Sequence, residues 1–312
     1  MAGIIDGVDQ RTQLAGHNRL ELLLFRLEGQ QLYGINVFKV REAVPCPALT
    51  KLPNAHPVIS GISNVRGKTV SIYDLSKGIG GRAVQDPQKC FVIITEYNRS
   101  IQGFLIRSVD RIVNTSWSEI MPPPAASGKK HYVTAITEID NQLIEIIDVE
   151  KVLAEVVGIN DTVSQSIIEQ FTALNHNKQF HILVADDSSV ARNQIHRTME
   201  QLGIKVTIVN DGLKALRQLQ AWAAEGLDVT QHIDLLISDI EMPEMDGYTL
   251  TTEIRKDPAI KNVRILLHTS MSGAFNNALV EKVGADKFIP KFSPDDLALT
   301  VQELLTSWHG RS

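Results

Sequence analysis

The sequence predicts two domains of different class: a strand-rich barrel or sandwich, followed by an α/β domain built on a doubly wound parallel sheet. The chain has 312 residues, whereas a typical domain has roughly 100–200. Before about residue 159 the chain shows many short strand patterns separated by glycines and prolines, which is typical of barrels and sandwiches. After about residue 178, strand and helix patterns alternate strictly, which favours a doubly wound sheet.

The first half contains short runs with strand character. Residues 20–27 and the alternating positions from Tyr33 to Val37 flank the turn Glu28-Gly29-Gln30 and predict a hairpin. Further strands are expected over residues 69–73, 90–96, 100–106, 133–139 and 142–147. Only two helices are expected in this half, near residues 38–43 and over residues 149–157.

The polar stretch 159–178 indicates a connector between the domains. Its apolar residues recur at helical spacing, which predicts a linker helix packed on one neighbour; they are Val163, Ile167, Ile168, Phe171 and Leu174. We therefore expect an N-terminal tail over 1–18, a first domain over 19–157, a linker over 158–178 and a second domain over 179–309.

The second half begins with the apolar run 180–185, which suits a strand buried on both faces. Apolar residues from Ala191 to Leu202 then follow the spacing of one helix face, and Gly203 comes directly after them as a helix C-cap. The remaining strands are expected over 206–209, 233–238, 263–268 and 287–290, and the remaining helices over 213–224, 248–256, 274–283 and 297–308. Five strand–helix units predict a five-stranded parallel sheet.

Composition excludes several classes of protein. The hydrophobic fraction of 43% and the charged fraction of 21% are those of a globular chain. The net charge of −5 argues against nucleic-acid binding by bulk electrostatics. It is unevenly divided, because residues 1–160 carry 17 basic and 16 acidic side chains and the remainder carries 14 and 20. The two halves are thus units of different character.

The compartment is expected to be the cytoplasm. Asp6 and Asp9 lie where a signal peptide needs basic and then apolar residues, and no apolar run is long enough for a transmembrane helix. Cys46 and Cys90 could form at most one disulfide. A chain of this size has core enough without it, so reduced thiols are expected.

Chemistry-bearing residues gather at the predicted strand ends of the second half. The Asp186-Asp187 pair closes the first strand, Asp239 the third and Thr269 the fourth, while Lys291 follows the fifth. Parallel strands end at one edge of a sheet, where ligands bind. Converging carboxylates suit Mg²⁺. Together with a lysine and a hydroxyl they favour a phosphoryl pocket in which an aspartate acts as the nucleophile.

The segment 238–247 (SDIEMPEMDG), with the acidic pair and Lys291, resembles the receiver domains of two-component signalling. The resemblance implies that Asp239 is the phosphoacceptor. It also implies that Asp187 binds Mg²⁺ directly, that Asp186 is its partner at the metal, and that Glu241 supplies a backbone carbonyl.

The same resemblance assigns Thr269 and Lys291 to the phosphoryl group, and Phe288 to a mobile aromatic that reports on phosphorylation. One departure concerns the residue after the lysine, which is usually proline in this family and is Phe292 here. Because a cis bond without proline costs roughly 2.5–4 kcal/mol, we expect either a trans bond with a rearranged loop or a strained site.

The first half shows no cluster of ligating or nucleophilic residues, which favours a binding module. Residues 59–75, with the turn Asn64-Val65-Arg66-Gly67, are similar to the CheW family of coupling proteins. The resemblance implies two intertwined SH3-like barrels and a partner-binding surface that includes Asn64, Arg66 and Gly67. Turn geometry is an equally good explanation for Asn64 and Gly67.

A CheW-like domain followed by a receiver resembles the CheV family. That resemblance implies a chemotaxis adaptor, not an enzyme apart from its own phosphorylation and dephosphorylation. It would link methyl-accepting chemoreceptors to the histidine kinase CheA at receptor arrays, and phosphorylation of Asp239 would regulate it.

Three rival functions can be compared with this one, and of these the phosphate sink stays open. A phosphate sink would drain CheA without a conformational output. A transcriptional regulator would need a DNA-binding output, which is not expected before the last residue, Ser312. A hydrolase would need a second acid two residues after Asp239, for which Glu241 is the candidate.

Overall fold

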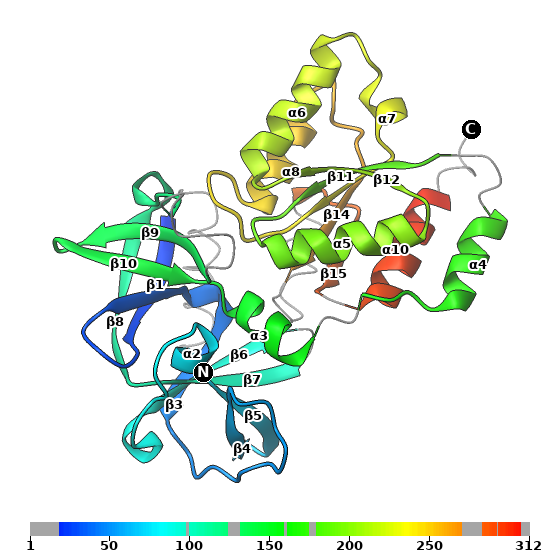
Figure 1. Ribbon diagram of the computed structural model, residues 1–312. Helices are drawn as coiled ribbons and strands as arrows, with labels where there is room; N and C mark the ends of the chain where they lie inside the picture. Colours follow the sequence, from blue (N-terminus) through cyan, green and yellow to red (C-terminus); the bar gives the residue numbers. More distant parts are fainter. Residues whose placement is uncertain are drawn as a thin grey trace, which may run out of the picture. The chain divides into compact units, whose positions relative to one another are not determined.

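The computed structural model describes residues 19–97, 100–123, 132–158, 161–174, 179–269, 283–291 and 293–306 (Figure 1). The chain divides into two compact units, one covering Arg19–Ile159 and the other including Asn160–Ser312. The expected tail over 1–18, most of the expected helix over 274–283, and Phe292 lie outside the described residues. None of the described helices combines the length and the apolar character that crossing a lipid bilayer requires.

The first unit contains two five-stranded sheets. One has the order β8-β1-β2-β10-β9, with bounds β1 (Arg19–Arg26), β2 (Leu32–Asn36), β8 (Ser108–Ser116), β9 (Val133–Ile139) and β10 (Gln142–Ile147). The other has the order β3-β6-β7-β5-β4, with bounds β3 (Val40–Pro45), β4 (Ile59–Val65), β5 (Lys68–Asp74), β6 (Phe91–Tyr97) and β7 (Ser100–Ile106). The expected β-rich first domain is confirmed.

The two sheets share one pairing pattern. In each, an edge strand pairs antiparallel with a hairpin, and the second strand of that hairpin lies parallel to the second strand of another hairpin. The described residues of this unit also form two α-helices and three 3₁₀ turns: α2 (Leu75–Gly78), α3 (Val149–Val157), η1 (Val37–Lys39), η2 (Pro87–Lys89) and η3 (Trp117–Glu119).

The packing of strand β1 explains its continuous apolar run from Leu22 to Phe25. Leu23 and Phe25 belong to the apolar core that both sheets share. Leu20, Leu22 and Leu24 belong to a second cluster on the opposite face. Successive side chains of a strand point to opposite faces, so both faces of β1 are buried.

The helix expected near residues 38–43 is not present. The chain makes the short turn η1 and then enters β3, which pairs antiparallel with β6. Exposure alternates along Val40–Pro45 with a period of two residues, which is the period of a strand. Pairing with β6 therefore outweighs the weak helical spacing.

The second unit is a five-stranded parallel sheet, as expected, with the order β12-β11-β13-β14-β15. Its strands are β11 (His181–Ala185), β12 (Lys205–Val209), β13 (Leu235–Ser238), β14 (Ile265–Thr269) and β15 (Lys287–Pro290). Its described helices are α4 (Gln165–Leu174), α5 (Ser189–Gln201), α6 (Gly212–Ala224), α7 (Val229–His232), α8 (Gly247–Lys256) and α10 (Pro294–Thr306).

Helices cover both faces of this sheet. Ile182 and Val184 of β11 pack in one cluster with residues of α4, α5 and α10. Leu183 and Ala185 pack in the other cluster, with residues of α6 and α8. The strand is buried on both faces, and its carboxyl end is left as the open edge at which side chains can meet a ligand.

Candidate functional site

Three carboxylates converge at the carboxyl edge of the parallel sheet. Asp186 directly follows β11 and Asp239 directly follows the neighbouring strand β13, with Ala185 and Ser238 paired at the strand ends. Oxygens of Asp186, Asp187 and Asp239 lie within 4.8 Å of one another. Asp186 and Asp239 are buried, whereas Asp187 is half-buried. The geometry thus brings together the three acids that the sequence placed at strand ends.

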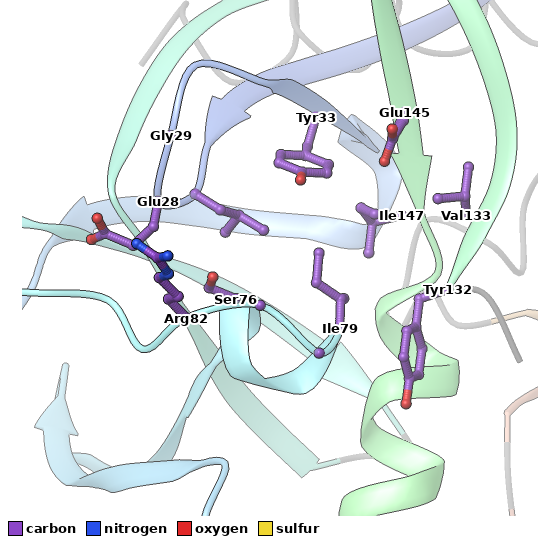
Figure 2. Close-up of a pocket in the computed structure, with 13 residues that line it drawn as sticks. Glu28, Gly29, Tyr33, Ser76, Ile79, Arg82, Tyr132, Val133, Glu145 and Ile147 are labelled. Carbon is purple, nitrogen blue, oxygen red and sulfur yellow. The ribbon is translucent and has the colours of Figure 1, made fainter.

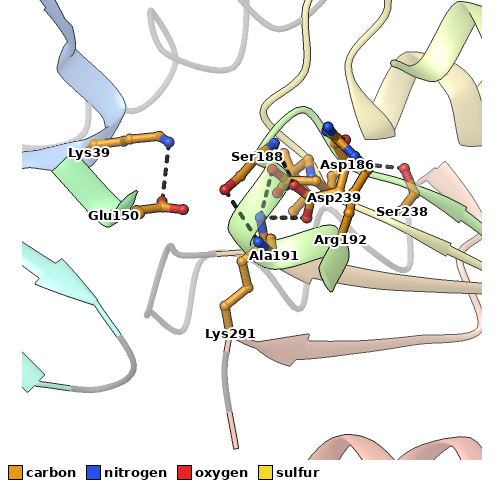
Figure 3. Close-up of polar contacts among 10 residues, drawn as sticks. Lys39, Glu150, Asp186, Ser188, Ala191, Arg192, Ser238, Asp239 and Lys291 are labelled. Carbon is orange, nitrogen blue, oxygen red and sulfur yellow. Dashed lines mark hydrogen bonds and ion pairs between the residues drawn. The ribbon is translucent and has the colours of Figure 1, made fainter. Parts of the chain in front are cut away.

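Lys291, which directly follows the edge strand β15, contacts this cluster. Its Nζ lies 2.8 Å from Asp186 Oδ2 and 2.8 Å from Asp239 Oδ2 (Figure 3). Its backbone N–H donates to the carbonyl of Thr269 at 2.8 Å, which extends the pairing of β14 with β15 by one residue. Lys291 is 3% exposed and Thr269 is fully buried, so the ammonium is held inside the protein by carboxylates.

Neighbouring groups fix both acids. The backbone N–H of Ser188 donates to Asp186 Oδ1 at 2.9 Å, and Arg192 Nη1 donates to the Asp186 carbonyl at 2.7 Å. The backbone N–H of Ile240 donates to Asp239 Oδ1 at 2.8 Å. Ser188 and Arg192 were not among the residues predicted for the site. Ser188 carries a detectable signal, because its hydroxyl caps the start of α5.

The electrostatics of the cluster favour a cation. Burial raises the pKa of Asp186 to about 8, and the carboxylates of Asp239 and Asp187 add to the rise while Lys291 opposes it. When all three acids are ionised, their negative charge exceeds the single positive charge of Lys291. Carboxylate oxygens are also the ligands that Mg²⁺ takes in proteins. Asp186, Asp187 and Asp239 therefore fit the magnesium ion that the sequence predicted.

The other expected residues lie around this edge. Glu241 is half-buried in the connection from β13 to α8. Phe288 is half-buried in β15, opposite Leu267 of β14. The bond that follows Lys291 reaches Phe292, outside the described residues. The roles of Glu241, Thr269 and Phe288 stay predictions.

Gly247 brings α8 against the acceptor. A Cβ atom at this position would lie 2.3 Å from the carbonyl oxygen of Asp239 and 3.0 Å from Ile240 Cα. The Gly247 N–H also donates to the Ile240 carbonyl at 2.9 Å. Only glycine allows this approach, so Gly247 sets the position of the backbone that carries Asp239.

In the first unit, the candidate partner-binding residues form the hairpin turn between β4 and β5. Arg66 and Gly67 have φ of 49° and 81°, as a two-residue turn with the twist of a hairpin requires. The Gly67 N–H donates to Asn64 Oδ1 at 2.8 Å. Turn geometry thus accounts for Asn64 and Gly67, and their contact with a partner stays a prediction.

Arg66 presents its side chain to solvent. The side chain is 80% exposed, and its Nη2 lies 2.6 Å from Oε2 of Glu42 in β3. The Nε atom contacts both oxygens of the same carboxylate. An exposed ion pair of this kind contributes little stability, so folding alone gives little reason for an arginine at the hairpin tip.

The first unit also has a hollow of about 660 Å³, lined by residues of β2, β9 and β10 on one side and by α2 with the loop that follows it on the other. Figure 2 shows Tyr33, Glu145 and Ile147 on one side of it and Ser76 and Ile79 on another. Burial, and then the Glu145 carboxylate, raise the pKa of Tyr33. A mixed apolar and polar lining is typical of binding sites.

Comparison with known proteins gives a match for each unit. Residues 21–157 match the CheW-like domain and residues 182–302 match the response regulator receiver domain. Chemotaxis protein CheV3 of Helicobacter pylori is 30% identical over 305 residues, which are 92% of this chain and 95% of the relative.

Two shorter relatives each resemble one unit. Chemotaxis protein CheW of Klebsiella aerogenes is 27% identical over 51% of this chain and 98% of its own length. Chemotaxis protein CheY1 of Helicobacter pylori is 34% identical over 40% of this chain and 95% of its own length.

Proposed function

Because the chain belongs to the CheV family of chemotaxis proteins, we propose that it links chemoreceptors to the histidine kinase CheA in the cytoplasm, and that phosphorylation of Asp239 regulates this link. The observation that carries the proposal is the contact of Lys291 with two converging carboxylates. The Nζ atom lies 2.8 Å from both Asp186 and Asp239.

The transfer step follows from the two oxygens of Asp239. Oδ1 accepts the N–H of Ile240, which leaves Oδ2 as the oxygen that faces Lys291. Oδ2 attacks the phosphorus of a phosphohistidine, and an O–P bond forms while the P–N bond breaks. The histidine nitrogen keeps the electron pair and takes up a proton. Lys291 and the Thr269 hydroxyl then neutralise and orient the phosphoryl oxygens.

Asp186, Asp187 and Asp239, with the backbone carbonyl of Glu241, would hold Mg²⁺. The ion supplies charge neutralisation for the phosphoryl oxygens. The chain's own contribution is to hold the carboxylates in place before the donor arrives. The bonds from Ser188 and Arg192 to Asp186 do this, and such preorganisation lowers the cost of reaching the transition state.

The first unit supplies the docking surface. In this proposal the exposed Arg66 side chain contacts the receptor or the kinase, with Asn64 and Gly67 shaping the turn that presents it. An exposed arginine that contributes little to the stability of the fold suits such a role, because arginines are enriched at interfaces. Methyl-accepting chemoreceptors are the expected partners.

Phosphotransfer from labelled CheA tests the central step. We expect Mg²⁺-dependent labelling of the wild-type chain and no labelling of Asp239→Asn. The matched control is Glu244→Gln, which removes an exposed carboxylate from the same β13–α8 connection and should leave labelling intact. Labelling of Asp239→Asn at the wild-type level would overturn the assignment. Retained binding of both variants to receptor signalling tips would show that they are folded.

The same variants separate a regulator from a phosphate sink. Kinase activity is measured in arrays assembled with the wild-type chain or with Asp239→Asn. A regulator changes the receptor control of CheA when it is phosphorylated. A sink lowers the level of phospho-CheA but leaves receptor control unchanged.

A further inference from the structure

The segment that joins the two units is packed into the core of the second one. Val163, Ile167 and Phe171 are 2%, 8% and 4% exposed, and they share a cluster with apolar residues of α5 and α10. The rings of Phe171 and Phe180 lie 5.8 Å apart. We call residues 161–174 the linker segment; it contains α4, which lies beside α10 in Figure 1.

Polar contacts tie the start of the linker segment to α10. The Ser164 N–H donates to Asp295 Oδ1 at 2.8 Å, and the Ser164 hydroxyl donates to Asp295 Oδ2 at 2.5 Å. Asp295 lies in the first turn of α10. The Ser164 carbonyl in turn accepts the N–H of Ile167, so the carboxylate of α10 holds the residue directly before α4.

A second set of contacts ties the linker segment to α5. Arg197 Nη1 lies 2.6 Å from Asp161 Oδ2. The Gln201 amide donates to the Asp161 carbonyl at 2.7 Å and accepts the Val163 N–H at 3.0 Å. The linker segment is therefore fastened to two helices.

Both of those helices begin at the candidate phosphorylation site. α5 starts at Ser189, two residues after Asp187, and α10 starts three residues after Lys291. Lys291 now contacts Asp239 Oδ2. A phosphoryl group bound to Oδ2 would occupy the position where the Lys291 ammonium now lies. The ammonium must therefore move away from Oδ2 and contact the phosphoryl oxygens instead. Asp295 is four residues after Lys291 in the sequence and lies in the first turn of α10.

We propose that the face formed by α5 and α10 is a binding surface for the linker segment whose occupancy falls when Asp239 is phosphorylated. The inference rests on the proposed function. Displacement of Lys291 shifts the first turn of α10 and loosens the bond between Asp295 and Ser164. Since this segment connects the two units, its release changes how far each unit can move from the other.

Hydrogen exchange of the full chain tests the proposal, with Mg²⁺ alone and with Mg²⁺ plus beryllofluoride as a phosphoryl mimic. Peptides covering residues 238–247 should become protected, and peptides covering 163–174 should exchange about tenfold faster, the effect of weakening one charge-assisted hydrogen bond. If residues 238–247 are unaffected by the mimic, the proposed function fails. If they are protected and the linker segment does not change, only the present inference is overturned.

The variant Asp295→Ala tests the tether itself. We expect fast exchange of the linker segment with or without beryllofluoride, and unchanged protection of residues 238–247 by the mimic. The charge-matched control is Asp296→Ala, in the same turn of α10, which should keep the response of the linker segment. Loss of the response in the Asp296 variant, or its survival in the Asp295 variant, would contradict the assigned role of Asp295.

Discussion

At the scale of single residues, Gly247 makes the position of Asp239 sensitive to one methyl group. A Cβ atom would lie 2.3 Å from the Asp239 carbonyl, so Gly247→Ala must displace backbone at the acceptor. We expect a loss of about 1–3 kcal/mol in unfolding free energy and a strong loss of labelling by phospho-CheA. Gly203→Ala is the control, since its Cβ meets open space and only its φ of 70° opposes the change. It should lower stability and spare labelling.

The buried imidazole of His268 should make the protein less stable at acid pH. Burial, and then the charge of Lys291, lower the pKa of His268 well below its ordinary value. In the unfolded chain His268 therefore binds a proton near pH 6.5, whereas in the folded chain it stays neutral at that pH. The free energy of unfolding consequently falls as the pH drops below that value.

The expected slope is at most about 1.4 kcal/mol per pH unit. Urea unfolding between pH 7.5 and 5, followed by the helical circular dichroism signal, measures it. His268→Gln should unfold with a shallower pH dependence, whatever its absolute stability. An unchanged slope would show that other groups dominate the acid response.

The site could be predicted from the sequence only as far as strand ends reveal it. Asp186 and Asp239 directly follow strands β11 and β13, whose apolar runs are easily recognised, and parallel strands end together. The hydrogen bond from Arg192 to the Asp186 carbonyl depends on the orientation of α5 relative to the sheet. The spacing of residues in the sequence does not reveal that orientation.

At the scale of elements, the parallel sheet was predictable because every residue of β11, β13 and β14 is buried, which demands continuous apolar runs. Strands β3, β4 and β8 were not predicted. β4 contains Gly61 and Asn64, and β8 carries charged and polar residues on exposed positions. In such strands pairing with neighbours decides the conformation more than the residues' own preference does.

The β4–β5 hairpin separates a folding role from a binding role. Arg66→Ala should leave thermal stability almost unchanged, because the ion pair with Glu42 is exposed, yet weaken binding to receptor tips or CheA by about tenfold. Surface plasmon resonance measures the affinity. Arg41→Ala is the matched control, since it breaks the Arg41–Glu96 ion pair of the same sheet. Equal binding by both variants would remove Arg66 from the docking surface.

At the scale of the whole molecule, Mg²⁺ should stabilise one unit and not the other. The converging acids belong to the unit that includes residues 160–312. A ligand at 100 times its Kd adds about 2.7 kcal/mol to the unit that binds it. Hydrogen exchange with Mg²⁺, and with Na⁺ at equal ionic strength, should show slower exchange in β11 and β13 only. Asp187→Asn should remove this effect, and an effect of equal size in β1 and β6 would point to screening.

The strand orders of the first unit also predict the order in which its two sheets form. The sheet of β3 to β7 is built from one continuous stretch, Val40–Ile106, whereas β2 must wait for β10, more than 100 residues later, as its parallel neighbour. Contacts between distant residues form slowly, and chains emerge from the ribosome amino end first. The sheet of β3 to β7 should therefore close first, while the amino-terminal hairpin β1–β2 stays exposed to chaperones until β10 has been synthesised.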